Sequence, residues 1–235
     1  MTLYKFLKKQ KQNQRKMWAI LLDPDKVDLH NFEELLEKIN ISQPDLLLVG
    51  GSFISEQKFH KVVKKLKKKC NLPVVLFPGS PAQVFSKADA ILLLNLISGR
   101  NPEYLIGKHV EAAPVLYQSG LEIIPTGYLL IENGRSTSVE YISNTKPIPR
   151  TKIDIALATA LAGEMLGLKM LYLEAGSGAK KPVPLKMIST ISKHCRLPII
   201  VGGGIKTKQR MLKAWAAGAD LVVVGTAFEE GGFKD

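Results

Sequence analysis

The stretch Tyr172-Leu173-Glu174-Ala175-Gly176-Ser177-Gly178 joins a short apolar run to a glycine-rich turn, with a carboxylate at the junction. The run before it, Lys169-Met170-Leu171-Tyr172-Leu173, is typical of a short buried strand. Because the turn has little side-chain bulk, its backbone N–H groups can approach a bound anion closely. A strand that ends in such a turn, beside a group able to transfer a proton, indicates an enzyme site.

Two similar transitions follow along the chain. The run Ile199–Val201 leads into Gly202-Gly203-Gly204, and Leu221–Val224 leads into Gly225-Thr226. Glycine can simply permit a tight strand-to-helix turn, so one such transition would be weak support for a binding site. Three consecutive ones favour a phosphate site built from backbone amides.

Short apolar runs recur over the whole length of the chain and predict the fold. Each is rich in Val, Ile or Leu without strict alternation, as in strands that are buried on both faces. The predicted strands are Met17–Leu22, Leu46–Val49, Val74–Phe77, Ala90–Leu94, Leu121–Ile124, Met170–Leu173, Ile199–Val201 and Leu221–Val224. The predicted helices are Phe32–Ile39, Gln57–Lys69, Tyr104–Gln118, Ile153–Leu166, Leu185–Lys193 and Lys208–Ala217. This alternation predicts a single domain over residues 1–235, a parallel (β/α)8 TIM barrel, with a doubly wound open sheet as the main alternative.

Two connections depart from a regular barrel. Residues 78–89 hold Gly79 and Pro81 and leave room only for an abbreviated third helix or an extended crossover. Residues 132–152 form a long, polar, proline-interrupted segment, which is either a lid over the site or a passive insertion.

The formal net charge of +12 raises the question of nucleic-acid binding. Much of the excess lies in two patches, Lys5–Lys16 and Lys58–Lys69. In the second patch the apolar residues recur at helical spacing, which is typical of an amphipathic helix with a solvated basic face. The more specific alternative is that these basic patches attract polyanionic substrates or an acidic membrane surface. No nucleic-acid-binding motif is present, so we expect no nucleic-acid partner and leave peripheral membrane contact open.

Composition favours a cytoplasmic protein. Hydrophobic residues make up 46% of the chain, enough for a sizeable core. No apolar run reaches the roughly 18 residues of a membrane span, and Met1–Lys16 lacks the apolar centre of a signal peptide. Cys70 and Cys195 lie far apart and indicate neither a disulfide framework nor a zinc site.

The ends of the first two predicted strands carry oxygen ligands. Asp23-Pro24-Asp25-Lys26 follows the first strand, and Gly50-Gly51-Ser52 follows the second. A carboxylate at this rim can hold Mg²⁺, which needs few protein oxygens and keeps waters or phosphate oxygens. We expect Asp23 and Ser52 to face each other at such an ion. The alternative is that an Asp serves only as a helix cap or turn residue, and we expect this of one of the two.

Glu174 is the candidate catalytic residue. A carboxylate after an apolar strand is costly to bury unless it is solvated, paired or functional. The structural alternative is an ion pair to Lys180, Lys181 or Lys206, and its position beside the phosphate turn favours catalysis. The four histidines lack metal-ligand spacing, and neither a serine-hydrolase elbow, a dinucleotide fingerprint nor a P-loop is present.

Over nearly its whole length the chain resembles the geranylgeranylglyceryl phosphate synthase family, which includes heptaprenylglyceryl phosphate synthases. The motifs that carry the resemblance are Leu22-Asp23-Pro24-Asp25-Lys26, Val49-Gly50-Gly51-Ser52, Leu76-Phe77-Pro78-Gly79-Ser80, Pro125-Thr126-Gly127-Tyr128, Ser143-Asn144-Thr145-Lys146-Pro147-Ile148-Pro149, Tyr172–Gly178, Val201–Ile205 and Val224-Gly225-Thr226. The Tyr172–Gly178 motif is specific, whereas three glycines after a strand recur in many phosphate-binding barrels.

The resemblance implies an activity and a set of site residues. It implies a barrel with a modified third helix that transfers a prenyl group from a polyprenyl diphosphate to the C3 hydroxyl of sn-glycerol 1-phosphate, forming an ether bond. It implies Mg²⁺ at Asp23 and Ser52, and a homo-oligomer, either a dimer or a hexamer. It implies glycerol phosphate binding by Tyr172, Leu173, Glu174, Ala175, Gly176, Ser177, Gly178, Gly202, Gly203, Gly225 and Thr226, with Gly204 a weaker candidate.

Further expectations concern the prenyl donor. Some bacterial members carry lysine two residues before the first Asp of the motif, where this chain has Leu21, so the resemblance favours a geranylgeranyl donor over a heptaprenyl one. Arg100 is either a diphosphate contact or a surface or capping residue. The tail needs an apolar groove outside the packed barrel centre, and we expect it where the third helix is reduced.

Two other classes of function stay open from the residues alone. One is a sugar-phosphate isomerase or aldolase on the same barrel, although no predicted strand ends in the lysine that a Schiff-base aldolase needs. The other is a noncatalytic phosphate-binding barrel, which would keep the glycines and tolerate loss of Glu174.

Overall fold

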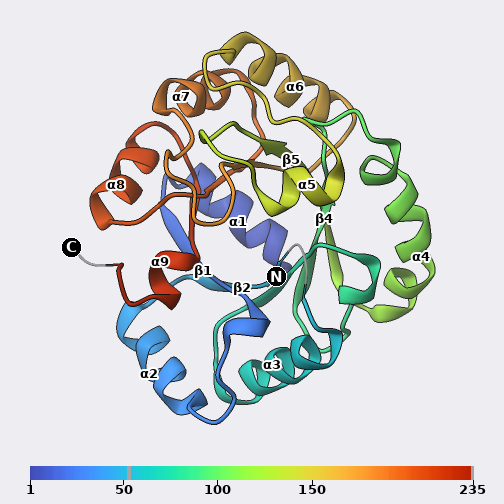
Figure 1. Ribbon diagram of the computed structural model, residues 1–235, viewed down its shortest axis with the longest axis vertical. Coiled ribbons are helices and arrows are strands. Elements are labelled where there is room, and N and C mark those ends of the chain that lie inside the picture. The colour runs from blue at the N-terminus through green and yellow to red at the C-terminus, as the bar shows by residue number, and fades with distance from the viewer. Residues whose placement is uncertain (52–53, 234–235) are drawn as a thin grey trace.

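In residues 1–51 and 54–233, the part of the chain that the computed structural model describes, eight parallel strands close into a barrel in sequence order (Figure 1). The strands are β1 (Met17–Leu22), β2 (Leu46–Gly51), β3 (Val74–Pro78), β4 (Ala90–Asn95), β5 (Glu122–Leu130), β6 (Met170–Glu174), β7 (Ile199–Gly202) and β8 (Leu221–Val224). Strand β1 pairs with β2 on one side and with β8 on the other, which closes the sheet. The predicted barrel is confirmed, and the open sheet is wrong.

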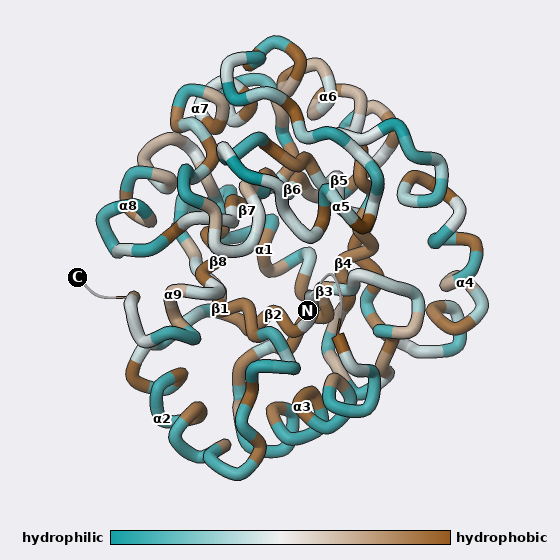
Figure 2. The backbone as a smooth tube through the Cα atoms, in the orientation of Figure 1, coloured by the Kyte–Doolittle hydropathy of each residue, from teal (hydrophilic) through white to brown (hydrophobic). Residues whose placement is uncertain are grey.

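The helices that cover the barrel lie where periodicity predicts them. They are α2 (Phe32–Ser42), α3 (Glu56–Lys69), α4 (Gly107–Ser119), α6 (Ile153–Met165), α7 (Leu185–His194) and α8 (Lys208–Ala216). Helix α3 shows the reason, because its four buried residues are Phe59, Val62, Val63 and Leu66, a single stripe at helical spacing. Figure 2 shows the hydrophobic residues concentrated in the strands, with hydrophilic stretches in the surrounding helices and loops.

The third connection is reduced, as predicted. Between β3 and β4 the chain forms only a single 3-10 turn, η2 (Pro81–Gln83). The buried amide of Gln83 holds this turn in place: it accepts from Gly79 N at 2.8 Å and donates to Gly51 O at 3.3 Å. A short crossover thus replaces a full helix on this side and leaves the outer face of the barrel less covered.

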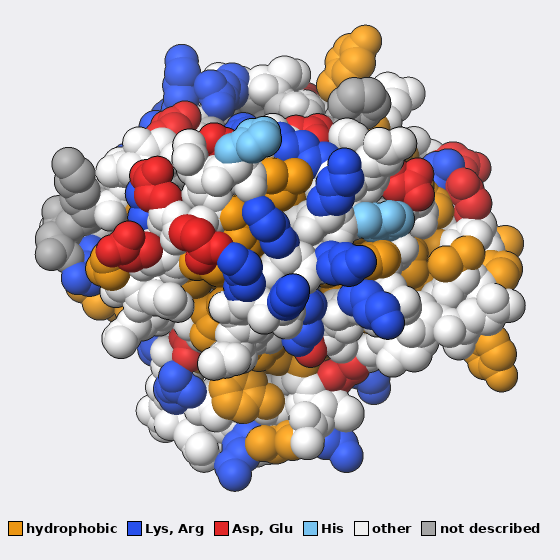
Figure 3. All heavy atoms as spheres, turned by 90° about the horizontal axis from the view of Figure 1, so that it is seen from below, with side chains coloured by type: hydrophobic (Ala, Val, Ile, Leu, Met, Phe, Trp, Pro, Cys, Tyr) orange, Lys and Arg blue, Asp and Glu red, His pale blue; other side chains and the backbone are white. Residues whose placement is uncertain are grey.

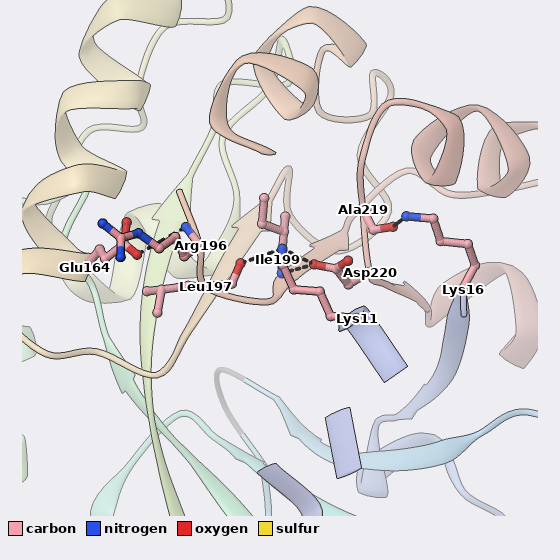
Figure 4. A network of polar contacts seen from close by, with 8 residues as sticks. All are labelled: Lys11, Lys16, Glu164, Arg196, Leu197, Ile199, Ala219 and Asp220. Carbon is pink, nitrogen blue, oxygen red and sulfur yellow. Dashed lines mark hydrogen bonds and ion pairs between the residues drawn. The ribbon is translucent and has the colours of Figure 1, made fainter. Parts of the chain in front are cut away.

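An N-terminal helix, α1 (Leu3–Gln12), closes the amino-terminal end of the barrel and is not among the predicted helices. Its Leu7 is buried among the inward-facing residues of the strands. The amides of Leu3 and Tyr4 donate to the carboxylate of Glu122 at the start of β5. At its other end, Lys11 Nζ lies 2.9 Å from Asp220 Oδ2, which also accepts from Ile199 N at 2.9 Å (Figure 4). Part of the Lys5–Lys16 patch is therefore a structural anchor.

The long segment after β5 is more ordered than its composition suggests. Strand β5 continues to Leu130, Ile131 forms a bridge with Ile148, and the short helix α5 (Ser138–Ser143) lies between them. Helix α9 (Thr226–Glu229) follows β8 directly. Within the described residues no helix combines the length and the apolar character needed to cross a bilayer.

Candidate active site

The carboxyl ends of β6, β7 and β8 bring the predicted site residues together at one end of the barrel. Glu174 is the last residue of β6 and pairs in register with Leu130 of β5 and Gly202 of β7. Side chains alternate along a strand, so Tyr172 and Glu174 both point to the interior, with Glu174 nearer the mouth. Glu174 is buried, with 6% of its surface exposed.

Burial dominates the chemistry of Glu174. Its Oε1 accepts from the amide of Gly176 at 2.5 Å, and no ion pair to Lys180, Lys181 or Lys206 forms among the described residues. Desolvation raises the pKa of Glu174 from 4.5 to about 7, although the hydrogen bond from the Gly176 amide favours the charged form. A carboxyl group with a pKa near neutrality can accept or return a proton at the working pH.

Three aromatic rings form the floor of the site. Phe77, Tyr128 and Tyr172 lie with ring centroids 5.3–6.2 Å apart. The Tyr172 hydroxyl is buried near Glu174, but it makes no hydrogen bond of good geometry with any described group. Burial, and then the neighbouring Glu174 charge, raises the pKa of Tyr172 well above its ordinary value, so the hydroxyl stays protonated as a donor.

The turns after β7 and β8 present backbone donors at the same end of the barrel. Gly203 and Gly204 both adopt positive φ, +80° and +71°, which glycine alone adopts readily. Within the described part of the chain, the amides of Gly203, Gly204, Gly225 and Thr226 donate to no other group. Free amides of this kind are suited to an anion.

A side-chain contact links the turns after β6 and β8. Ser177 Oγ lies 3.2 Å from Thr226 Oγ1. The predicted glycerol phosphate residues of these two turns therefore lie at one place, and those of β6 and β7 adjoin them through the Glu174–Gly202 pairing.

Side chains outside the predicted motifs hold the glycine turns in place. Asn133 Nδ2 donates to Ala175 O at 2.5 Å, and Arg135 Nη2 donates to Gly178 O at 2.5 Å. Arg210 Nη1 donates to Gly204 O at 2.7 Å. The length and polarity of residues 132–152 were the only signal that Asn133 and Arg135 serve the site.

The first strand places Asp23 at the same end. Asp23 is half-buried; its Oδ1 accepts from Asp25 N at 3.0 Å, and its Oδ2 has no partner in the described part of the chain. Asp25 instead accepts a hydrogen bond from Ser55 N at 3.1 Å, which stabilises the turn. This is the structural role expected of either Asp23 or Asp25. The predicted partner Ser52 lies outside the described residues.

The donor set at Asp23 fits Mg²⁺ in one particular way. The described residues contain no cluster of three or more His, Cys, Asp or Glu side chains. A protein cage for a metal is therefore not formed by these side chains. One carboxylate with a free oxygen, completed by waters and substrate phosphates, is the arrangement that Mg²⁺ commonly takes.

Arg100 caps its own loop. Its Nη1 donates to Gly99 O at 2.8 Å and to Ile97 O at 3.2 Å. These are the contacts of a capping residue, and the diphosphate contact stays a prediction.

An apolar groove opens beside the mouth where the third helix is reduced. It runs between the β3–β4 connection, α4 and α5, and its wall includes Val84, Leu94, Leu96, Leu116 and Ile142. Phe77 and Tyr128 line the groove and also belong to the aromatic floor beneath Glu174. The predicted position of the groove is confirmed, and it is continuous with the candidate site.

Fold and geometry together define a (β/α)8 barrel with glycine turns and an ionisable carboxyl group at its mouth. The model of the PcrB family matches residues 10–235. The chain belongs to the PcrB family.

Named relatives agree with this assignment. A geranylgeranylglyceryl phosphate synthase from Flavobacterium johnsoniae is 55% identical over 97% of this chain and 94% of its own length. One from the archaeon Methanosphaera stadtmanae is 41% identical over 92% of this chain and 88% of its own. A crystal structure of (S)-3-O-geranylgeranylglyceryl phosphate synthase from Thermoplasma acidophilum, in complex with its substrate sn-glycerol-1-phosphate, superposes with a TM-score of 0.91 at 32% identity. That comparison covers 97% of this chain and 92% of the other.

Proposed function

We propose that this protein transfers a prenyl group, from geranylgeranyl diphosphate, to the C3 hydroxyl of sn-glycerol 1-phosphate. The observation that carries the proposal is the adjacency of two unlike subsites. Free amides beside a buried carboxyl group suit a small phosphorylated alcohol, and the apolar groove that reaches the same aromatic floor suits an isoprenoid. Homology to synthases of this name supports the same pair of substrates.

The alcohol substrate is positioned by its phosphate. We assign its phosphate to the amides of the turns after β6, β7 and β8, with the Ser177 and Thr226 hydroxyls beside them. These donors are fixed by the backbone, so they bind the anion without ordering long side chains. The C3 hydroxyl then lies toward Glu174.

Glu174 accepts the proton of that hydroxyl. In the step we propose, the bond between C1 of the prenyl chain and the diphosphate oxygen breaks, and its electron pair leaves with the diphosphate. A bond forms between C1 and O3 of glycerol phosphate, and the O3 proton passes to the Glu174 carboxylate. The same negative charge stabilises positive charge on the allylic carbon, and the aromatic floor beneath it excludes water.

We also propose that Asp23 binds Mg²⁺, with Ser52 as the predicted second ligand. When bound, the ion offsets charge that grows on the departing diphosphate. The observation in its favour is that Asp23 Oδ2, just after β1, accepts no hydrogen bond from any described residue. Cytoplasmic location and a homo-oligomer, dimer or hexamer, also stay predictions.

The direct test supplies the purified protein with labelled sn-glycerol 1-phosphate and prenyl diphosphates of several lengths. We expect an ether product, formed fastest with the C20 donor, and release of diphosphate. A protein that binds glycerol phosphate but yields no ether with any donor would contradict the proposal. The same outcome would favour the noncatalytic barrel.

A further inference from the structure

Helix α3 carries more positive charge than its own contacts use. It has seven lysines in its fourteen residues. Four of them have partners: Lys58 with Asp25 O, Lys65 with Leu29 O, Lys67 with Asp89 and Lys69 with Glu33. The other three, Lys61, Lys64 and Lys68, are exposed and make no polar contact among the described residues.

These three lysines form one stripe. Their spacing of three and four residues places them on the same side of α3, opposite the buried Phe59, Val62, Val63 and Leu66. Like charges at this spacing repel one another, and Glu56 is the only acidic residue of the helix. Figure 3 shows Lys and Arg side chains gathered in the middle of the face that α3 occupies.

Helix α3 packs beside the β3–β4 connection, which lines the apolar groove. Helix α3 packs on the β3–β4 connection through His60 and Phe85, whose rings stack with centroids 4.5 Å apart. Pro81 and Val84 of the same connection line the groove. One short segment therefore separates the basic face from the proposed site of the prenyl chain.

We propose that Lys61, Lys64 and Lys68 dock the protein on the anionic surface of a lipid bilayer, from which the prenyl donor enters the groove. This inference rests on the proposed function, because a long prenyl diphosphate is an amphiphile that resides in membranes. Each lysine near an anionic surface contributes attraction within a Debye length. A nucleic acid would complement the positive charge, but it would not occupy the neighbouring apolar groove.

The test is co-sedimentation with vesicles, without any substrate. The protein is mixed with vesicles of pure phosphatidylcholine, or of equal parts phosphatidylcholine and phosphatidylglycerol. We expect partition onto the anionic vesicles only, weakened by added salt. The triple variant K61Q/K64Q/K68Q should bind these vesicles more weakly by a factor on the order of 100.

A matched control removes equal charge elsewhere. Lys186 and Lys193 of α7 and Lys213 of α8 are exposed, and these helices lie across the barrel from α3 (Figure 1). The variant K186Q/K193Q/K213Q should bind the anionic vesicles as the unmodified protein does. Equal weakening in both triple variants would mean that net charge alone acts, and would overturn the proposal. So would tight binding of a random-sequence RNA oligomer with no binding to anionic vesicles.

Two assays with differently presented donors measure docking and catalysis separately. With a donor dispersed in detergent, both triple variants should form ether product at the rate of the unmodified protein. With the donor embedded in anionic vesicles, only K61Q/K64Q/K68Q should slow. Vesicle binding without any ether product would refute the proposed function while leaving the docking surface standing.

Discussion

Gly202 lies directly against Glu174 across the β6–β7 pair, and no side chain fits between them. A Cβ atom at residue 202 would lie 2.6 Å from Glu174 Oε2 and 2.5 Å from the Tyr172 hydroxyl. The absence of a side chain on β7 thus makes room for the carboxyl group on β6. The glycine is required here by packing, because its φ is not positive.

Replacing Gly202 with Ala should therefore displace the catalytic carboxyl group. We expect the kcat for ether formation to fall by about 100-fold, as a shift of about 1 Å at a reacting group costs that much. Gly232→Ala is the control, because a Cβ there would lie 3.8 Å from its nearest neighbour, Ala227 O. Unchanged turnover in Gly202→Ala would contradict the assigned position of Glu174.

Glu174→Gln should remove the proton acceptor while keeping the shape of the site. We expect kcat to fall by roughly 100- to 10,000-fold, the usual contribution of general acid–base catalysis. The affinity for glycerol phosphate, measured by calorimetry, should change little because backbone amides bind the phosphate. In the unmodified protein kcat/KM should rise with pH through about 7, the pKa of Glu174, because the ionised form is the acceptor. A flat profile, or fast turnover by the variant, would rule out this role.

The same substitution should alter how stability depends on pH. The folded pKa of Glu174, about 7, lies above its ordinary value of 4.5, so the folded state binds the proton more tightly. The resulting stability is fully present below about pH 4.5 and is lost as pH rises through about 7, with an upper bound of about 3 kcal/mol. Thermal unfolding at pH 8.5 should therefore show Glu174→Gln to be more stable than the unmodified protein. At pH 4, below both pKa values, the two should be alike.

Arg135→Ala should loosen the turn that holds the phosphate. Arg135 donates to the carbonyl groups of Ser177 and Gly178, so its loss frees the turn without removing any phosphate donor. We expect the KM for glycerol phosphate to rise about tenfold, with a smaller change in kcat, since a charge-assisted hydrogen bond is worth about 1.5–3 kcal/mol. Arg150→Ala is the control, because Arg150 binds Glu132 O in the same segment and contacts no glycine turn. Equal effects of both substitutions would point to the segment as a whole.

Sequence periodicity predicts the barrel because most strand residues are buried on both faces of the sheet. The start of all but one of the eight strands agrees with the prediction to the residue, and α3 agrees because its apolar stripe is unbroken. Helix α1 could not be predicted in this way, because lysines and glutamines dominate it and only a few apolar residues, such as Leu7, face the barrel. Its role depends on distant acceptors, Glu122 and Asp220, which no local pattern reveals.

The candidate site also contains residues that local sequence patterns predict and residues that they do not. Glycine turns and a carboxylate after an apolar strand are local patterns, so Glu174 and the turn residues could be named from the sequence. Asn133 and Arg135 act on a turn about forty residues away in the chain, through contacts that only the β5–β6 pairing creates. The pKa of Glu174 likewise follows from burial by the whole barrel mouth, and not from its neighbours in sequence.

Asp23→Asn should weaken the use of Mg²⁺ without altering the fold. The amide keeps an oxygen that can accept from Asp25 N, but it removes the charge that a divalent cation needs. Titration of Mg²⁺ against the rate should show a midpoint at least tenfold higher. The control is Asp25→Asn, because the Asp25 carboxylate accepts from Ser55 N and is not a predicted ligand. This substitution should leave the midpoint unchanged. An identical metal requirement in Asp23→Asn would exclude this carboxylate as a ligand.

Asp220→Ala should detach the end of α1 from the barrel. Asp220 is buried and accepts from both Lys11 Nζ and Ile199 N, so its removal leaves a strand amide and an ammonium group without their acceptor. We expect unfolding in urea to show a loss of roughly 1–3 kcal/mol. Lys38→Gln breaks only the exposed pair with Glu34 and should cost less than about 0.5 kcal/mol. Because α1 lies at the end of the barrel opposite Glu174, the KM values of Asp220→Ala should be unchanged below its unfolding temperature, and raised values would mean that α1 shapes the mouth as well.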